Sequence, residues 1–157
     1  MARLYGRCPK NRRCVARVPH GHWQSSTFIA ALRAESITAP FLIEGAVNAE
    51  VLTAYLEQVL CPELCRGDIV VLDNLSTHKI PSVAALISAR GATVRYLPPY
   101  SPDLNPIEMA FAKLKAHLRQ AAARTLAELQ CALAASLRCF GPAHCQGFFR
   151  HAQYASI

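Results

Sequence analysis

Hydrophobic and polar positions along this chain alternate at two periods, one typical of strands and one typical of helices. Residues 27–33 and 40–46 are short, mostly apolar runs on either side of a polar turn, and they predict an antiparallel β-hairpin. Residues 49–60 predict a helix that starts at Asn48 as its N-cap, with Pro62 and Gly67 ending it before the next strand. Its apolar positions form one stripe: Val51, Leu52, Tyr55, Leu56, Val59 and Leu60.

The next segment predicts a strand, a helix and a second strand. An apolar run ends in an acid at residues 69–73, and residues 91–97 form another short apolar run. Between them, residues 80–90 have apolar positions at helical spacing, namely Val83, Leu86 and Ile87. This order predicts a right-handed parallel crossover, in which both strands end at the same edge of the sheet. Asp73 is therefore expected at the edge where such units bind ligands.

Two further helices are predicted in the C-terminal part. Asn105 and Pro106 form a helix start, and Glu108 lies in the first turn, where a carboxylate meets free N–H groups. Thr125 is expected to start a last long helix, and residues 141–157 should form a shorter tail. The helix after Pro106 should have a core face of Ile107, Phe111, Leu114 and Leu118, and another common face of Glu108, Ala112, Lys115 and Arg119.

Length and composition fit one folded domain. The chain has 157 residues, of which 52% are hydrophobic and 17% charged, enough for a proper core. No apolar run is long enough for a membrane span, and no apolar signal core follows the first charges. Seven scattered cysteines are typical of a reducing compartment, and Cys61 and Cys65 lack the spacing of a zinc site. We expect a cytoplasmic protein with no membrane partner.

The charge of the chain favours a polyanionic partner. Lysine and arginine number 17 against 10 acids, which gives a formal charge of +7. Residues 1–26 carry prolines, few periodic apolar positions and a concentration of cations, so they predict an irregular basic lead-in. A solvated arm explains this charge equally well.

Asp73 and Glu108 are the candidate metal ligands. Each also has a structural explanation, since Asp ends strands in turns and Glu caps helices. The residues between them include a proline-rich connector at 97–102, which is stiff and restricts where the next helix begins. We therefore expect their carboxyl groups within about 10 Å of each other, a range that suits a site for hard cations.

Two segments resemble a known family. Val-Leu-Asp-Asn-Leu-Ser-Thr-His-Lys (71–79) and Leu-Pro-Pro-Tyr-Ser-Pro-Asp-Leu-Asn-Pro-Ile-Glu (97–108) are similar to the second and third acidic motifs of DDE transposases. The similarity is to the bacterial insertion-sequence branch of the Tc/mariner superfamily. Residue numbers 73 and 108 differ by 35, so 34 residues intervene, the spacing that this branch favours. The resemblance extends from Arg-Leu-Tyr-Gly-Arg (3–7) to residues 149–154.

The resemblance implies metal-dependent DNA cleavage and strand transfer by an α/β domain, a ribonuclease H-like mixed sheet flanked by helices. It implies two Mg²⁺ ions, with Mn²⁺ as a substitute. Asp73 would be a catalytic ligand of one ion and Glu108 of the other, and the absent first Asp would bridge them. The implied partners are transposon ends and target DNA, and also a second copy of the chain or a full-length transposase, in the bacterial cytoplasm at the nucleoid. The residues expected to contact DNA are Asn74, His78, Lys79, Lys115 and Arg119, although a plain helix-start role explains His78 equally well.

The chain departs from the family pattern near its beginning. No segment before residue 27 matches the first, central strand. The first acid in the sequence is Glu35, so no Asp precedes it that could be the first catalytic Asp. The family's helix-turn-helix region has no counterpart either. We expect residues 1–157 to be an N-terminally truncated catalytic domain with impaired activity. The alternative is a non-catalytic DNA-binding or subunit-pairing remnant, and a third interpretation is an unrelated α/β domain with accidental motif matches.

Overall fold

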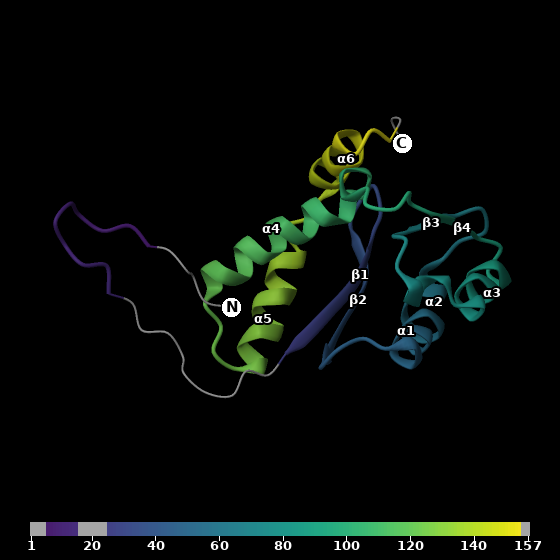
Figure 1. The fold of residues 1–157 in the computed structure, drawn as a ribbon, viewed down its shortest axis with the longest axis horizontal. Helices are drawn as coiled ribbons and strands as arrows, with labels where there is room; N and C mark the ends of the chain where they lie inside the picture. Colours follow the sequence, from purple (N-terminus) through teal and green to yellow (C-terminus); the bar gives the residue numbers. More distant parts are fainter. Residues whose placement is uncertain (1–5, 16–24, 155–157) are drawn as a thin grey trace.

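Two small sheets and the helices around them form the fold (Figure 1). The structure is a computed structural model and describes residues 6–15 and 25–154. In chain order the elements are β1 (Ser26–Leu32), β2 (Ile37–Glu44), α1 (Ala49–Tyr55), the π-helix η1 (Leu56–Leu60), α2 (Cys61–Glu63), β3 (Ile69–Leu72), the 3-10 helix η2 (Ser76–Lys79), α3 (Pro81–Ala89), β4 (Thr93–Tyr96), the 3-10 helix η3 (Pro102–Leu104), α4 (Pro106–Ala121), α5 (Leu126–Leu137) and α6 (Pro142–His151). The α/β class predicted from the sequence is confirmed. Within the predicted lead-in, residues 6–15 are exposed and contain only a turn, and most of the rest lies outside the described residues.

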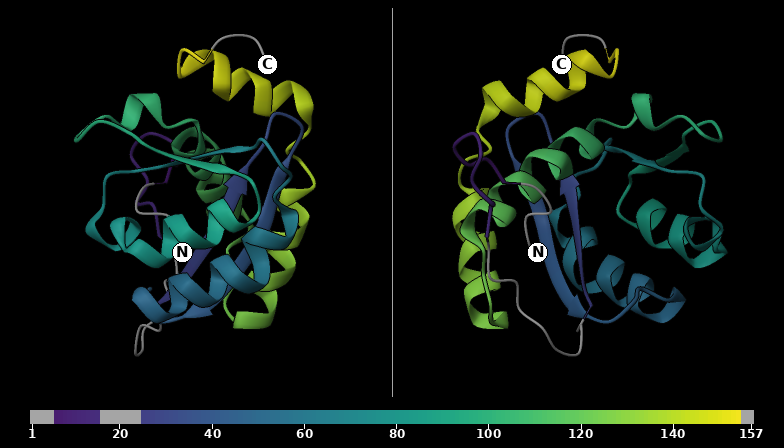
Figure 2. Two further views of the ribbon diagram at one scale, coloured as in Figure 1. Left: turned by 90° about the vertical axis from the view of Figure 1, so that its right-hand side faces the viewer. Right: turned by 60° about the vertical axis from the view of Figure 1, so that its left-hand side comes forward.

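Strands β1 and β2 form the predicted antiparallel hairpin. Their register runs from Ser26 opposite Glu44 to Leu32 opposite Ile37, with a shift between Ile29 and Ala31. Because side chains alternate along a strand, the two faces of the hairpin enter two different cores. One core lies toward α1 and α3, and the other lies toward α4, α5 and α6 (Figure 2). The hairpin is therefore the layer between two groups of helices.

Strands β3 and β4 form the predicted parallel pair. Ile69 lies opposite Thr93 and Leu72 opposite Tyr96, and α3 makes the connection between the strands. The side chains of Val83 and Ile87 on α3 are buried, as their helical spacing predicts. Both strands thus end at one edge, and Asp73 follows β3 directly at that edge.

The helix that begins after Asn48 is longer than predicted. The Asn48 side chain accepts a hydrogen bond from the Val51 N–H at 2.8 Å, so the predicted N-cap is confirmed. The helical turns continue past Leu60 to Glu63, so the predicted end is three residues short, and the helix ends between Pro62 and Gly67. A proline inside a helix lacks the N–H for one hydrogen bond, and its ring clashes with the carbonyl four residues earlier. Here the π-helix η1 lies directly before Cys61 and Pro62, and the helical turns continue beyond it.

Helix α4 has the two faces predicted for it. Leu114 is buried, Phe111 and Leu118 are partly buried against the same core, and the face with Lys115 and Arg119 is exposed. Asn105 occupies the N-cap position with extended backbone, but its side chain makes no capping hydrogen bond. The start of the helix is thus as predicted, while the capping contact is not made.

The C-terminal part contains one more helix than predicted. Thr125 caps α5 and forms a capping box with Glu128, which confirms the predicted helix start. Residues 141–157 were expected to be a tail, yet Pro142–His151 form α6. Cys145 on α6 is fully buried, so this helix closes the core that it shares with α4.

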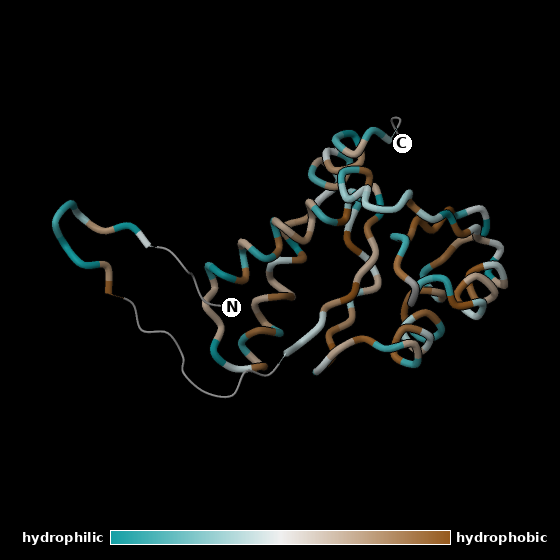
Figure 3. Tube along the Cα trace, in the orientation of Figure 1, coloured by the Kyte–Doolittle hydropathy of each residue, from teal (hydrophilic) through white to brown (hydrophobic). Residues whose placement is uncertain are grey.

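Within residues 6–15 and 25–154, the four strands form two separate two-stranded sheets. Two-stranded sheets are marginal alone, so packing on helices stabilises each of them here. Hydrophobic residues, drawn in brown, recur along the strands and helices in Figure 3, and many of them belong to the two cores. A contact between Arg33, after β1, and Asp68, before β3, joins the two sheets. No helix in the described ranges is long and apolar enough to cross a membrane.

Candidate active site at the carboxyl edge of β3 and β4

Asp73 lies at the first turn beyond β3. Its Oδ1 accepts a hydrogen bond from the Leu75 N–H at 3.2 Å, which is the local turn that Asp favours after a strand. Just before it, the Leu72 carbonyl accepts a hydrogen bond from the Leu97 N–H at 2.8 Å, which extends the β3–β4 pairing by one residue. The backbone around Asp73 is therefore fixed by contacts on both sides.

The short helix η2 places His78 against this carboxylate. Nδ1 of His78 lies 2.5 Å from Oδ1 of Asp73, although the contact lacks the direction of a hydrogen bond. The Tyr96 hydroxyl donates to the His78 carbonyl at 3.0 Å, so η2 is held against the end of β4. Asp73, His78 and Tyr96 form one network. The described contacts of the Asp73 carboxylate use Oδ1, and this side chain is 39% exposed.

Other predicted residues of this segment surround the network. Asn74 follows Asp73 and is half-buried, and Lys79 is exposed at the end of η2. An exposed ammonium beside an acidic edge can neutralise a phosphate that approaches the carboxylate. The structure therefore brings Asp73, Asn74, His78 and Lys79 together in one short stretch.

Glu108 lies in the first turn of α4 and is exposed. Lys115 and Arg119 are exposed along the same face of the helix, as predicted. Lys113 is different, because its Nζ lies 5.1 Å from the centre of the Phe140 ring and contributes to packing through a cation–π contact. The free cations of this face are thus the two that the sequence indicated.

The two carboxylates are not directly linked. No hydrogen bond or ion pair in the described ranges joins Asp73 to Glu108, and their predicted approach stays a prediction. Over the same part of the chain, no group of three or more His, Cys, Asp or Glu side chains is placed to hold a metal ion. The donor types still fit a divalent cation, because both groups are carboxylates whose side chains reach solvent.

The sequence interpretation missed the aromatic and apolar side chains at this edge. Tyr100 is fully exposed, Leu75 is 56% exposed and Tyr96 is 40% exposed. All three follow or end the two parallel strands, so they gather on the side where Asp73 lies. The signal was present in the sequence, since an aromatic between prolines in a connector has no helix or strand to pack its ring.

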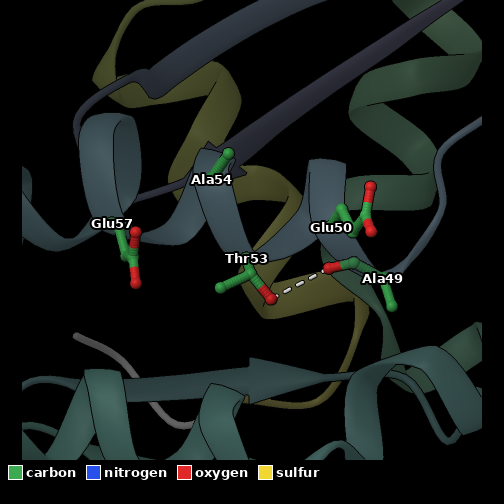
Figure 4. Close-up of a pocket in the computed structure, with 5 residues that line it drawn as sticks. All are labelled: Ala49, Glu50, Thr53, Ala54 and Glu57. Atoms are coloured by element: carbon green, nitrogen blue, oxygen red, sulfur yellow. Dashed lines mark hydrogen bonds between the residues drawn. The ribbon is translucent and has the colours of Figure 1, made fainter.

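A pocket elsewhere carries no such chemistry. It lies on the outer face of α1 and is lined by Ala49, Glu50, Thr53, Ala54 and Glu57 (Figure 4). The Thr53 hydroxyl donates to the Ala49 carbonyl at 2.9 Å and is used within the helix. Glu50 and Glu57 are two helical turns apart, about 10 Å along the axis, so they cannot hold one ion.

The comparisons with known proteins point to one family. The model of the family described as DDE superfamily endonuclease matches residues 1–130, more than half of the chain. No curated protein matches the chain.

Solved structures share the fold over nearly all of this chain. A Mos1 strand transfer complex matches with a TM-score of 0.67 at 17% identity, covering 98% of this chain and 46% of that one. A Mos1 mariner paired-end complex with Mn matches at 0.64 and 16% identity, covering 98% and 47%. A Mos1 transposase paired-end complex with the left transposon end matches at 0.64 and 15% identity, with the same coverage. The chain thus spans about half the length of these proteins, and the ribonuclease H-like fold expected from the sequence is confirmed.

Proposed function

This chain belongs to the DDE superfamily endonuclease family, and from that premise we propose that its carboxyl edge acts on DNA phosphodiesters during transposition. The observation that carries the proposal is the position of Asp73, directly beyond β3, with its side chain 39% exposed. Glu108 supplies a second exposed carboxylate at the start of α4. The similar structures are strand transfer and paired-end complexes, which supports DNA as the substrate.

We assign Asp73 and Glu108 as ligands of a divalent cation, Mg²⁺ or Mn²⁺. Hard cations take carboxylate oxygens, and both side chains keep such oxygens accessible. When bound, the cation would supply activation of the attacking oxygen and stabilisation of the leaving oxygen. The chain's own part is to hold the Asp73 backbone in its turn and to keep η2 in place through Tyr96.

The exposed cations bind the DNA backbone in this proposal. Lys79 lies beside Asp73, and Lys115 and Arg119 follow Glu108 along α4. Contacts to phosphate do not depend on the base sequence, so binding should tolerate changes in DNA sequence. Because these contacts are electrostatic, binding should also weaken as the salt concentration rises.

The test is a DNA titration at several salt concentrations. The measurement is fluorescence anisotropy of a labelled duplex with the unchanged chain and with Lys79→Ala, Lys115→Ala and Arg119→Ala. Each variant should reduce the slope of log affinity against log salt by about 0.9. Arg90→Ala is the matched control, because Arg90 is exposed at the opposite edge, before β4 begins. Affinity that does not change with salt would refute the proposal.

One observation favours a second candidate function, in which the chain binds DNA without cutting it. Two-metal chemistry needs ligands for both ions, and the described residues provide no group of three. In this case the chain docks on DNA, or pairs with another copy or a full-length transposase. This second function predicts that the 157-residue chain does not nick supercoiled DNA with Mg²⁺ or Mn²⁺. Nicking that disappears in Asp73→Asn would instead establish the chain as an active nuclease.

A further inference from the structure

Tyr100 has an unusual position at the carboxyl edge. Its side chain is fully exposed, at 102% of the reference area, and no other large apolar or aromatic side chain in the described ranges is as exposed. Its φ is 56°, in the left-handed region that a residue with a Cβ rarely adopts. Left-handed backbone costs roughly 1–2 kcal/mol per residue. Because the ring is exposed, its packing does not offset this cost within the fold.

The backbone on both sides of Tyr100 is fixed. On one side, the Leu97 N–H donates to the Leu72 carbonyl, next to Asp73. On the other side, the Leu104 carbonyl accepts a hydrogen bond from the Tyr154 hydroxyl at 3.1 Å, and the Leu104 N–H donates to the Ser101 backbone carbonyl. Prolines at 99 and 102 restrict the remaining freedom. The loop that carries the ring is therefore anchored at both ends. Binding of a ligand to the ring would cost little additional backbone entropy.

Chain length places this ring near Asp73. Tyr100 is three positions after Leu97, with two residues between them, so their Cα atoms are at most about 11 Å apart. Leu75 and Tyr96 add exposed apolar surface at the same edge. The charged groups of these segments are Asp73, Lys79, Arg95 and Asp103, and both cations are exposed.

We infer that Tyr100 stacks on a nucleobase of the DNA that enters this edge, at an unpaired or frayed end. The inference rests on the proposed function, because it takes DNA as the substrate. Every base offers a flat π-face, and stacking on an aromatic side chain is tolerant of sequence. The nearby cations hold the phosphates, and the ring adds an apolar contact that salt does not screen. A partner protein would also cover an exposed ring, but the formal charge of +7 of the chain, together with the exposed Lys79 and Arg95 on these segments, favours a polyanion.

The test compares two labelled DNA probes by anisotropy: a blunt duplex and the same duplex with a three-nucleotide 3′ overhang. Tyr100→Asn removes the ring and keeps a residue that tolerates left-handed backbone, so the fold is preserved. Tyr100→Phe keeps the ring, and Leu126→Ala is the control for truncating an exposed apolar side chain elsewhere, since Leu126 is 39% exposed on α5.

We expect Tyr100→Asn to weaken binding of the overhang probe by about fivefold or more, since stacking on one base contributes about 1–3 kcal/mol. Its effect on the blunt duplex should stay below about twofold, with the salt slope unchanged for both probes, because the ring contacts a base and not a phosphate. Tyr100→Phe and Leu126→Ala should behave like the unchanged chain.

The outcomes separate the inference from the proposed function. If the unchanged chain binds neither probe, the proposed function fails and the inference fails with it. If it binds both and Tyr100→Asn changes neither affinity, or both equally, the stacking role is wrong and the DNA-binding function stands. If sedimentation velocity shows a dimer that Tyr100→Asn dissociates, the ring serves a protein interface and the inference is overturned.

Discussion

The contact between Arg33 and Asp68 joins the two sheets, and its removal should destabilise the fold in a pH-dependent way. Both guanidinium N–H groups face the carboxylate, one at 3.4 Å, and Asp68 also accepts from the Cys65 N–H at 2.9 Å. Hydrogen bonds to charged groups contribute roughly 1.5–3 kcal/mol, whereas exposed ion pairs contribute about 0.2–1 kcal/mol. Since the two side chains are 34% and 24% exposed, we expect Asp68→Asn to cost about 1 kcal/mol at pH 7.

The pH dependence follows from the carboxyl group. The hydrogen bond from Arg33, helped by the Cys65 N–H, holds the pKa of Asp68 below its ordinary value. A lowered pKa in the folded state stabilises the protein fully above the unfolded-state pKa, which is about 3.9. This stabilisation is lost as the pH falls through the folded-state pKa. The pKa of Arg33 is raised by the same hydrogen bond, so the guanidinium stays charged throughout.

Urea unfolding followed by circular dichroism measures this effect at pH 7 and at successively lower pH values, down to the most acidic pH at which the chain still folds. The difference in the free energy of unfolding between the unchanged chain and Asp68→Asn should be present at pH 7 and decrease as the pH falls. Asp103→Asn is the matched control, because Asp103 is exposed on η3 and forms no ion pair in the described ranges. A difference that persists undiminished at low pH, or is absent at pH 7, would refute the reasoning.

Two further changes test local contacts in the fold by urea unfolding at pH 7. Tyr55 is buried, its hydroxyl donates to the Ala39 carbonyl at 3.0 Å, and burial raises the pKa of that hydroxyl. Tyr55→Phe should cost about 1–2 kcal/mol, since the carbonyl loses its donor, and an unchanged free energy of unfolding would show that water replaces the hydroxyl. Thr125→Ala removes the capping box with Glu128 and should lower the free energy of unfolding by about 1 kcal/mol. Thr125→Ser keeps a capping hydroxyl and should keep most of this stability.

Local patterns in the sequence were sufficient for most elements. The β-hairpin, the parallel β3–β4 pair and the faces of α4 follow from periodicity and turn signals that act over a few residues. The π-turn before Pro62 and helix α6 were not predictable in this way. The first depends on how a helix adapts to a missing N–H, and the second depends on the burial of Cys145 beneath α4.

The positions of the two candidate acids in the fold were predictable, whereas the contacts around them were less so. Asp73 and Glu108 were located because a strand end and a helix start are both marked in the sequence. The contact of His78 with Asp73 and the hydrogen bond from Tyr96 depend on side-chain conformations across two elements, which spacing does not specify. The exposure of Tyr100 likewise depends on the path of a whole connector.

The central claim is that Asp73 and Glu108 bind the same divalent cation, and a double-mutant cycle on Mn²⁺ affinity tests it most directly. Free Mn²⁺ is measured by electron paramagnetic resonance during titration of the unchanged chain, Asp73→Asn, Glu108→Gln and the double variant. Glu57→Gln, an exposed carboxylate on the outer face of η1, is the control and should leave the affinity unchanged. A shared site predicts that each single variant weakens binding and that the double variant loses less than the sum, with a coupling of about 1 kcal/mol or more. Losses that add to within about 0.5 kcal/mol would show that the two carboxylates act separately.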